Sequence, residues 1–74
     1  MTFAEIINRI HERLVGSKLT RVYSETVEFV WKKKEYRVFM SVTNQLEVRS
    51  IDQKYEYQIG EETAHSKRVK QFLS

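Results

Sequence analysis

Histidines are the first side chains to consider for chemistry, and this 74-residue sequence contains two, His11 and His65. A histidine can act as a general base near neutral pH or as a metal ligand. A metal site on a helix needs a second ligand three or four residues further on, and neither histidine has one there. We therefore interpret both as partly solvated residues on helices, and we expect no metal or other cofactor.

Nucleophilic and nucleotide-dependent catalysis are hard to build from the remaining residue types. The sequence has no cysteine, and none of its serines lies in a Gly-x-Ser-x-Gly motif. Its only glycines, Gly16 and Gly60, cannot form a glycine-rich phosphate loop or a dinucleotide fingerprint. We therefore expect no enzymatic activity. The one enzymatic alternative is a metal-independent ribonuclease that uses a histidine together with lysine, arginine and tyrosine side chains.

A cluster of basic residues, Lys32, Lys33, Lys34 and Arg37, lies between two strand-like stretches. At the tip of a hairpin, such a cluster can follow the phosphate backbone of a nucleic acid. The competing interpretation is that lysines at a turn are solvated and protect the sheet from edge-to-edge aggregation. Both interpretations predict an exposed hairpin tip.

A second basic run, Ser66-Lys67-Arg68-Val69-Lys70, falls near the C-terminus. Together with an order of helix, strands and helix, it resembles the double-stranded RNA-binding domain, whose last helix opens with a Ser-Lys-Lys-x-Ala-Lys run that grips phosphates. Val69 stands where that run has alanine, and only four residues follow Lys70. The resemblance is one of topology, and it implies phosphate contacts by Lys67, Arg68 and Lys70.

The elements that must position these residues follow from hydrophobic periodicity. Apolar residues at three- and four-residue spacing, between a Thr2–Glu5 capping box and Gly16, predict a helix over residues 3–15. From Leu19 the spacing becomes two, which predicts strands with short polar breaks at residues 33–34, 44–45 and 52–53. Residues 19–24 form either a separate strand or the start of one long bent strand. Acidic residues followed by basic ones predict a second helix over residues 61–73.

This order predicts a single α+β domain over residues 1–74, with an N-terminal helix, an antiparallel meander of three to five strands and a short C-terminal helix. One face of the sheet is apolar and is the expected core beneath the first helix. Its members are Val27, Phe29, Trp31, Tyr36, Val38, Met40, Val42, Leu46, Val48, Tyr55, Tyr57 and Ile59.

The opposite face of the sheet mixes apolar with basic residues. Its apolar members are Val30, Phe39, Ile51 and, if the first strand is in register, Val22; its basic members are Lys32, Arg37, Arg49 and Lys54. If this face is open, it suits single-stranded nucleic acid or a protein partner. Alternatively, the second helix covers it through Val69, Phe72 and Leu73, while glutamates pair with basic neighbours across the strands.

The charge balance favours a protein partner over nucleic acid. Thirteen basic and ten acidic residues give a net charge of +3, whereas nucleic-acid-binding domains usually concentrate more positive charge. We therefore predict a small protein-binding module, such as an inhibitor or adaptor, that acts through its sheet face, sheet edge or basic hairpin. Many phage-encoded inhibitors of host machinery share this size class. Nucleic-acid binding by the hairpin tip and the basic helix is the alternative.

Nine residues form the candidate binding set, namely Lys32, Lys33, Lys34, Arg37, Phe39, Arg49, Lys67, Arg68 and Lys70. An exposed edge strand would also permit a homodimer through sheet extension. No apolar run reaches the ~20 residues of a membrane span. Charged residues interrupt the apolar pattern of the N-terminus, so we expect a cytoplasmic protein without a membrane partner.

Overall fold

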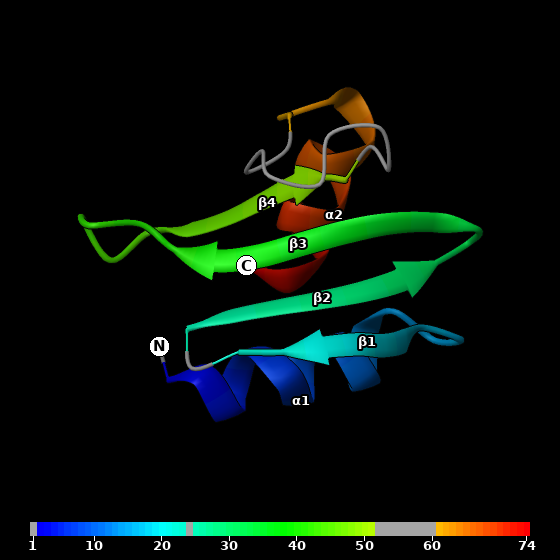
Figure 1. Cartoon of the computed structure of the whole chain (residues 1–74), viewed down its shortest axis with the longest axis horizontal. Coiled ribbons are helices and arrows are strands. Elements are labelled where there is room, and N and C mark those ends of the chain that lie inside the picture. The colour runs from blue at the N-terminus through cyan, green and yellow to red at the C-terminus, as the bar shows by residue number, and fades with distance from the viewer. Residues whose placement is uncertain (1, 24, 52–60) are drawn as a thin grey trace.

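The computed structural model describes residues 2–23, 25–51 and 61–74. Its elements run in chain order as α1 (Phe3–Arg13), β1 (Lys18–Val22), β2 (Thr26–Trp31), β3 (Lys34–Met40), β4 (Leu46–Ser50) and α2 (Ala64–Leu73) (Figure 1). This order confirms the expected α+β layout of helix, antiparallel strands and helix. The strand expected around residues 55–59, and Lys54 before it, lie outside the described residues.

Helix α1 begins at Thr2, whose side chain accepts a hydrogen bond from the backbone N–H of Glu5 at 3.3 Å. It ends at Arg13, earlier than expected, because Leu14 leaves the helical conformation with φ −108° and ψ 72°. The chain then turns through Gly16 at φ +88°, a left-handed conformation that glycine adopts without steric cost. The glycine therefore lies in the turn that follows the helix, as expected.

The four strands form one antiparallel sheet in the order β1-β2-β3-β4. Cross-strand partners such as Val27 and Val38 bring the apolar residues of neighbouring strands onto one face. Strand β1 is a separate strand, and its pairing with β2 is irregular between Leu19 and Arg21. Because of this irregularity, Val22 lies opposite Val27. The sequence pattern placed Val22 on the opposite face only if the first strand was in register. The irregularity breaks that register, so Val22 shares the face of Val27.

The turn between β2 and β3 contains two lysines, Lys32 and Lys33, with φ of 52° and 65°. Trp31 pairs with Lys34 across it, so the break lies one residue earlier than expected. A type I′ hairpin turn requires positive φ at both central residues, and it is common because it matches the right-handed twist of its strands. Asn-Gly is the usual pair at these positions, which is why a Lys-Lys turn is hard to locate from sequence.

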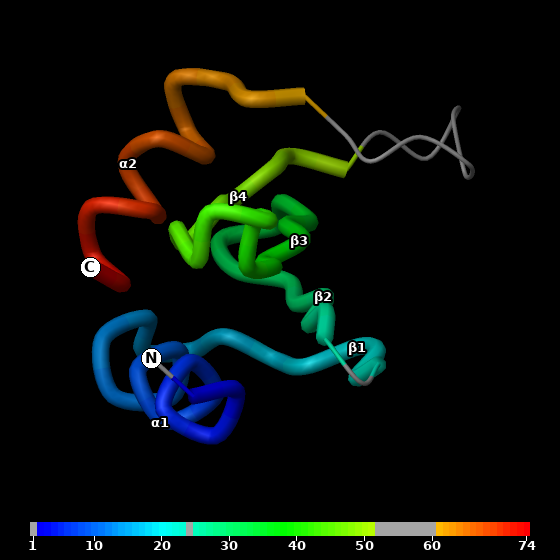
Figure 2. The backbone as a smooth tube through the Cα atoms, turned by 90° about the vertical axis from the view of Figure 1, so that its left-hand side faces the viewer, coloured from blue at the N-terminus to red at the C-terminus, as the bar shows by residue number. Residues whose placement is uncertain are grey.

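Both helices pack on the same face of the sheet (Figure 2). The core between helices and sheet consists of Ile6, Ile10, Leu14, Val27, Phe29, Tyr36, Val38, Leu46, Val48, Val69 and Leu73. The alternative in which α2 covers Phe39 and Val30 on the opposite face is therefore wrong. A helix is about 10 Å wide and strands are about 4.8 Å apart, so one helix is too narrow to bury a face of four strands.

One residue expected in the core is not there. Val42 lies in the connection between β3 and β4 and is fully exposed. Its two-residue spacing from Met40 continues the strand pattern past the end of β3. The chain leaves the strand at Ser41 and turns through Asn44 at φ +60°, so the alternation of faces no longer applies.

Helix α2 begins at Ala64, three residues after the expected boundary, because Thr63 and Ser66 form a reciprocal capping box. The Ser66 N–H donates to Thr63 Oγ1 at 3.1 Å, and the Thr63 N–H donates to Ser66 Oγ at 2.7 Å. Glu61 instead pairs with Ser50 on the outer edge of β4 through backbone bonds of 2.8 and 3.2 Å. The acidic residue that suggested a helical first turn therefore belongs to the sheet edge.

Two arginines of α1 hold the C-terminal end of α2. Arg9 donates to the Leu73 carbonyl at 2.8 Å. Arg13 donates to the carbonyls of Phe72 at 2.9 Å and Ser74 at 2.8 Å. Carbonyls at a helix C-terminus lack intrahelical partners and carry partial negative charge, so the guanidinium groups satisfy both needs. These bonds help to keep α2 beside α1 on one face of the sheet.

Candidate functional site

The sheet face opposite the helices, here called the open face, is covered by no helix in the described part of the chain (Figure 2). Strand register assigns to it Thr26, Glu28 and Val30 of β2, Glu35, Arg37 and Phe39 of β3, and Glu47 and Arg49 of β4. Phe39 and Val30 are half-buried there by their neighbours within the sheet. Three of the candidate binding residues, Arg37, Phe39 and Arg49, therefore share one surface.

The open face is hollowed beside Phe39, with a volume of about 440 Å³. The residues that line this Tyr23–Phe39 hollow are Tyr23, Glu25, Thr26, Arg37, Phe39 and Met40. Tyr23 is 48% exposed, and its hydroxyl accepts a hydrogen bond from Arg21 at 3.3 Å. Sequence reasoning missed Tyr23 and Met40, because Tyr23 follows a strand and Met40 belongs to the core face by its spacing. The hollow offers an apolar side chain of a partner a place between aromatic and thioether groups.

Glu28 lies at the centre of the open face and is only 7% exposed. Arg37 donates to its Oε1 at 3.3 Å, and Arg21 is its partner across the β1–β2 pair. The other carboxylate oxygen, Oε2, has no hydrogen-bond partner among the described residues. A buried oxygen without a donor is costly, so a donor supplied by a binding partner at this point would be stabilising.

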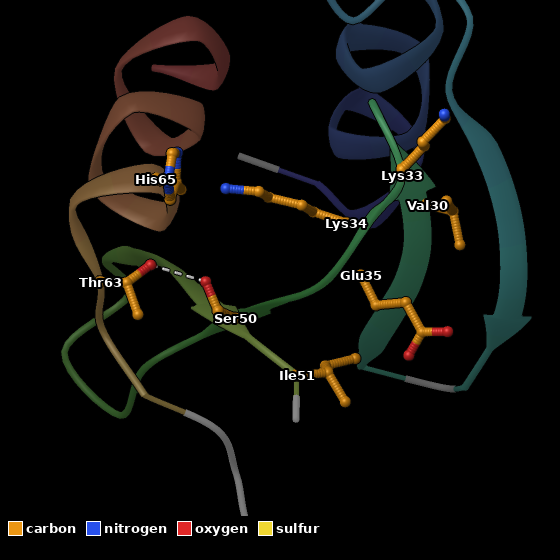
Figure 3. A pocket seen from close by; sticks show the side chains of 8 residues that line it. All are labelled: Val30, Lys33, Lys34, Glu35, Ser50, Ile51, Thr63 and His65. Atoms are coloured by element: carbon orange, nitrogen blue, oxygen red, sulfur yellow. Dashed lines mark hydrogen bonds between the residues drawn. The ribbon is translucent and has the colours of Figure 1, made fainter. Parts of the chain in front are cut away.

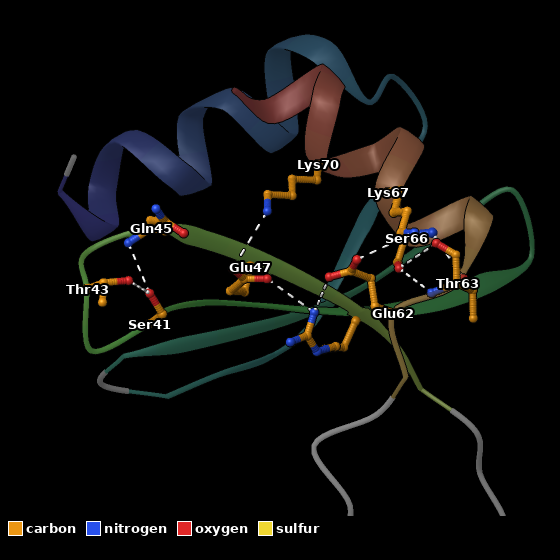
Figure 4. A network of polar contacts seen from close by, with 10 residues as sticks. Ser41, Thr43, Gln45, Glu47, Glu62, Thr63, Ser66, Lys67 and Lys70 are labelled. Atoms are coloured by element: carbon orange, nitrogen blue, oxygen red, sulfur yellow. Dashed lines mark hydrogen bonds and ion pairs between the residues drawn. The ribbon is translucent and has the colours of Figure 1, made fainter.

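A network of ion pairs joins the open face to α2 along β4 (Figure 4). Arg49 bonds Glu47 at 3.1 Å and Glu62 at 2.8 Å. Lys67 lies 3.7 Å from Glu62, and Lys70 reaches from α2 to Glu47 at 3.6 Å. Carboxylates of the same chain thus offset the charges of three candidate binding residues, Arg49, Lys67 and Lys70. This pairing reduces their attraction for a further anion.

The end of the sheet that carries the β2–β3 turn, here called the hairpin end, combines aromatic and basic groups. Trp31 donates from Nε1 to the Val15 carbonyl at 3.0 Å, which fixes its ring. Phe72 of α2 meets that ring edge to face, with centroids 6.0 Å apart. The ammonium group of Lys32 lies 4.5 Å from the ring centroid, in a cation–π contact.

A second hollow, of about 470 Å³, lies beside the hairpin end (Figure 3). Its lining residues are Val30, Lys33, Lys34, Glu35, Ser50, Ile51, Thr63 and His65. Within it, the ammonium group of Lys34 points toward His65 of α2 (Figure 3). Both His65 and the distant His11 are exposed.

Eight of the nine candidate binding residues fall into three groups, and the ninth, Arg68, lies on α2. Arg37, Phe39 and Arg49 lie on the open face, and Lys67 and Lys70 lie in the ion-pair network. Lys32, Lys33 and Lys34 lie at the hairpin end. Arg68 shares a face of α2 with His65 and Phe72, because the three recur at helical spacing. The nine residues therefore do not form one contiguous surface.

The described residues contain neither a cluster of metal ligands nor a membrane-spanning helix. Within residues 2–23, 25–51 and 61–74, no three histidine or carboxylate side chains come close enough together to hold a metal ion. Neither α1 nor α2 is long and apolar enough to cross a membrane.

Comparison of the chain with protein-family models, with curated proteins and with solved structures gives no match.

Proposed function

We propose that this protein is a non-enzymatic protein-binding module, an inhibitor or adaptor that contacts another protein through the open face. The observation that carries the proposal is the packing of both helices on one side of the sheet, which leaves the half-buried Phe39 on a face that no helix of residues 2–23, 25–51 and 61–74 covers. The Tyr23–Phe39 hollow is the proposed centre of the contact.

The residue types of the hollow support a protein partner. Tyrosine, phenylalanine, methionine and arginine are enriched in protein interfaces, and hot spots often contain tyrosine and arginine. The guanidinium of Arg49 lies 5.8 Å from the ring centroid of Phe39, and Arg37 borders the hollow. An apolar centre within a rim of already paired charges limits the side-chain entropy that binding would cost.

The charges on and beside the open face also favour a protein over a polyanion. Among the residues that the structure describes, four there are basic (Lys18, Arg21, Arg37, Arg49) and four are acidic (Glu25, Glu28, Glu35, Glu47). A balanced face of this kind repels neither sign strongly, and it can select a partner with a complementary charge pattern. A phosphate backbone would meet as many carboxylates as cations.

The sheet edges are weaker candidates for the contact. Strand β1 is irregular between Leu19 and Arg21 and carries charged residues, features that hinder pairing with another strand. The outer edge of β4 already bonds to the backbone of Glu61. The face is therefore the proposed surface, and sheet extension into a homodimer is the competing outcome.

Photo-crosslinking in the cells that make the protein tests this proposal. A benzophenone amino acid is placed at Tyr23 or at Phe39 in separate variants, and at the exposed Glu12 of α1 as a control. We expect a discrete adduct with one other protein from the two positions on the open face and none from Glu12. Adding Glu25→Arg to the Tyr23 variant should remove the adduct, because it reverses the charge of an exposed residue at the rim of the hollow.

Two results would contradict the proposal. Equal labelling from all three positions would mean that the open face has no special affinity. An adduct at twice the mass of the chain would mean that the face binds a second copy of the protein instead of a different partner.

A further inference from the structure

We propose a second binding site at the hairpin end, specific for single-stranded nucleic acid. Lys32 and Lys33 would contact phosphates, and Trp31 and Phe72 would stack with bases. Proteins that bind single strands without sequence preference combine these two kinds of group. The site lies at the opposite end of β2 and β3 from the Tyr23–Phe39 hollow, and it does not depend on the proposed protein-binding function.

The cations at this end have no carboxylate partners among the described residues. No glutamate of residues 2–23, 25–51 and 61–74 forms an ion pair with Lys32, Lys33, Lys34 or Arg68. Lys67 and Lys70, on the other side of α2, are both paired. A phosphate that approaches the hairpin end thus meets cations without displacing a carboxylate, and such contacts dominate the affinity of proteins for nucleic acid.

The aromatic pair is held in place and is partly accessible. The bond from Trp31 to the Val15 carbonyl and the edge contact with Phe72 fix the indole, while Phe72 is 45% exposed. Lys32 covers the indole ring. Stacking with a base is stronger than an exposed cation–π contact. A base would therefore replace the Lys32 ammonium on the ring and leave it to contact the adjoining phosphate.

The backbone at the tip gives a separate argument. The backbones of Lys32 and Lys33 both have left-handed conformations, which residues other than glycine and asparagine seldom adopt. Asn-Gly would form the same turn with less strain. Strained residues of this kind cluster at binding sites, where the side chain is retained for its function. The structure assigns that function to the two ammonium groups.

Helix α2 extends the basic surface along one side of the hairpin. His65, Arg68 and Phe72 recur at spacings of three and four residues, so they share one helical face. Phe72 on this face contacts Trp31, and Lys34 points from the hairpin toward His65 (Figure 3). A strand of nucleic acid could therefore run between the hairpin and α2 with cations on both sides.

Trp31 is the only tryptophan of the chain, so its fluorescence reports directly on this site. The probe is an oligothymidylate of about twelve nucleotides, within the usual range of such sites. Two further polymers of equal charge serve for comparison, an abasic DNA strand and polyglutamate. We expect the oligothymidylate to quench Trp31, the abasic strand to bind more weakly without quenching, and polyglutamate to do neither.

Matched variants locate the site. The pair Lys32→Ala and Lys33→Ala should lower the affinity for oligothymidylate about tenfold or more at low salt. It should also reduce the slope of log affinity against log salt by about 0.7 for each phosphate that the variant no longer binds. The pair Lys67→Ala and Lys70→Ala removes the same charge from the paired side of α2 and should leave both quantities nearly unchanged. Phe39→Ser should have no effect, which separates this site from the open face.

Three results would overturn the proposal. The first is the absence of quenching even at low salt. The second is quenching or binding by polyglutamate equal to that by oligothymidylate, which would indicate an acidic protein as the ligand. The third is an equal loss of affinity in the two lysine pairs, which would indicate that net charge and not this site attracts the strand.

Discussion

The strained lysine turn between β2 and β3 should affect the stability of the protein. Lys33 has φ +65°, and a left-handed conformation costs an L-residue about 1–2 kcal/mol. Glycine avoids that cost but adds about 0.5–1 kcal/mol of entropy to the unfolded chain. We therefore expect Lys33→Gly to raise the free energy of unfolding by up to about 1 kcal/mol, measured by urea denaturation.

Lys34→Gly is the matched control, because Lys34 is the first residue of β3. Glycine in a strand loses entropy without relieving strain, so this variant should be less stable than the wild type by about 0.5–1 kcal/mol. If both variants were destabilised equally, the left-handed conformation of Lys33 would store no strain. If Lys33→Gly gained stability and lost affinity for oligothymidylate, the turn would hold a strained lysine whose ammonium group is needed for binding.

Tyr36 provides a prediction about pH. Its ring is buried and stacks on Phe29 at 5.5 Å, and burial raises the pKa of Tyr36 above its ordinary value of 10.0. Above pH 10 the unfolded chain therefore loses a proton that the folded chain keeps, so stability falls as the pH rises through the folded pKa. We expect Tyr36→Phe to lose less stability than the wild type between about pH 9 and pH 11. Parallel urea midpoints of the two proteins over that range would contradict this prediction.

At the scale of the element, the position of α2 depends on α1. Arg9 reaches the Leu73 carbonyl, and hydrogen bonds to charged groups contribute about 1.5–3 kcal/mol. Because Arg9 is partly exposed, we expect Arg9→Met to cost somewhat less, about 1–2 kcal/mol. Amide hydrogen exchange should accelerate in α2 before it does in β2 and β3.

The control for this prediction is Arg68→Met on the exposed side of α2. Arg68 has no ion pair among the described residues, so its loss should change stability by less than about 0.5 kcal/mol. If Arg9→Met were equally mild, the bonds between the two helices would not fix α2. The side of the sheet that α2 occupies would then follow from Val69 and Leu73 alone.

The sequence predicts the elements better than it predicts their arrangement. Two-residue and helical spacings identify α1, the strands and α2, because each element must bury one stripe of apolar residues. The same spacing is compatible with α2 on either face. Long-range contacts select one of them, namely the burial of Val69 and Leu73 in the shared core and the bond from Arg9 to Leu73. The irregularity of β1 also leaves no local signal, and it moves Val22 to the other face.

In the candidate sites, too, the sequence predicts what depends on strand spacing and misses what depends on long-range contacts. Strand alternation predicts that Arg37, Phe39 and Arg49 share a face, because they lie on neighbouring strands in register. It cannot predict the pairing of Trp31 with Phe72, which joins residues 41 positions apart in the chain. Nor can it predict that Lys67 and Lys70 meet carboxylates, because their partners come from β4 and from the chain before α2.

At the scale of the whole molecule, the two proposed sites lie at opposite ends of the same two strands. Strand β2 has six residues, and at about 3.3 Å per residue it is about 20 Å long. That length separates the Tyr23–Phe39 hollow from the lysine turn. A protein partner and a nucleic-acid strand could therefore bind together, and the carboxylates along β4 keep the second site from extending across the open face.

The core joins both ends of the chain, and this makes a prediction about the whole fold. Ile6 and Leu73 belong to one buried cluster, and Leu73 is the last residue of α2. A domain of this size has a net stability of only about 3–5 kcal/mol. Removing a buried leucine side chain costs about 2–5 kcal/mol.

We expect Leu73→Ala to leave much of the protein unfolded at room temperature by circular dichroism, with all elements lost together. The exposed Val42→Ala should stay within about 0.5 kcal/mol of the wild type. A Leu73→Ala protein that lost only α2 and kept the sheet would show that α1 and the strands are stable without the C-terminal helix.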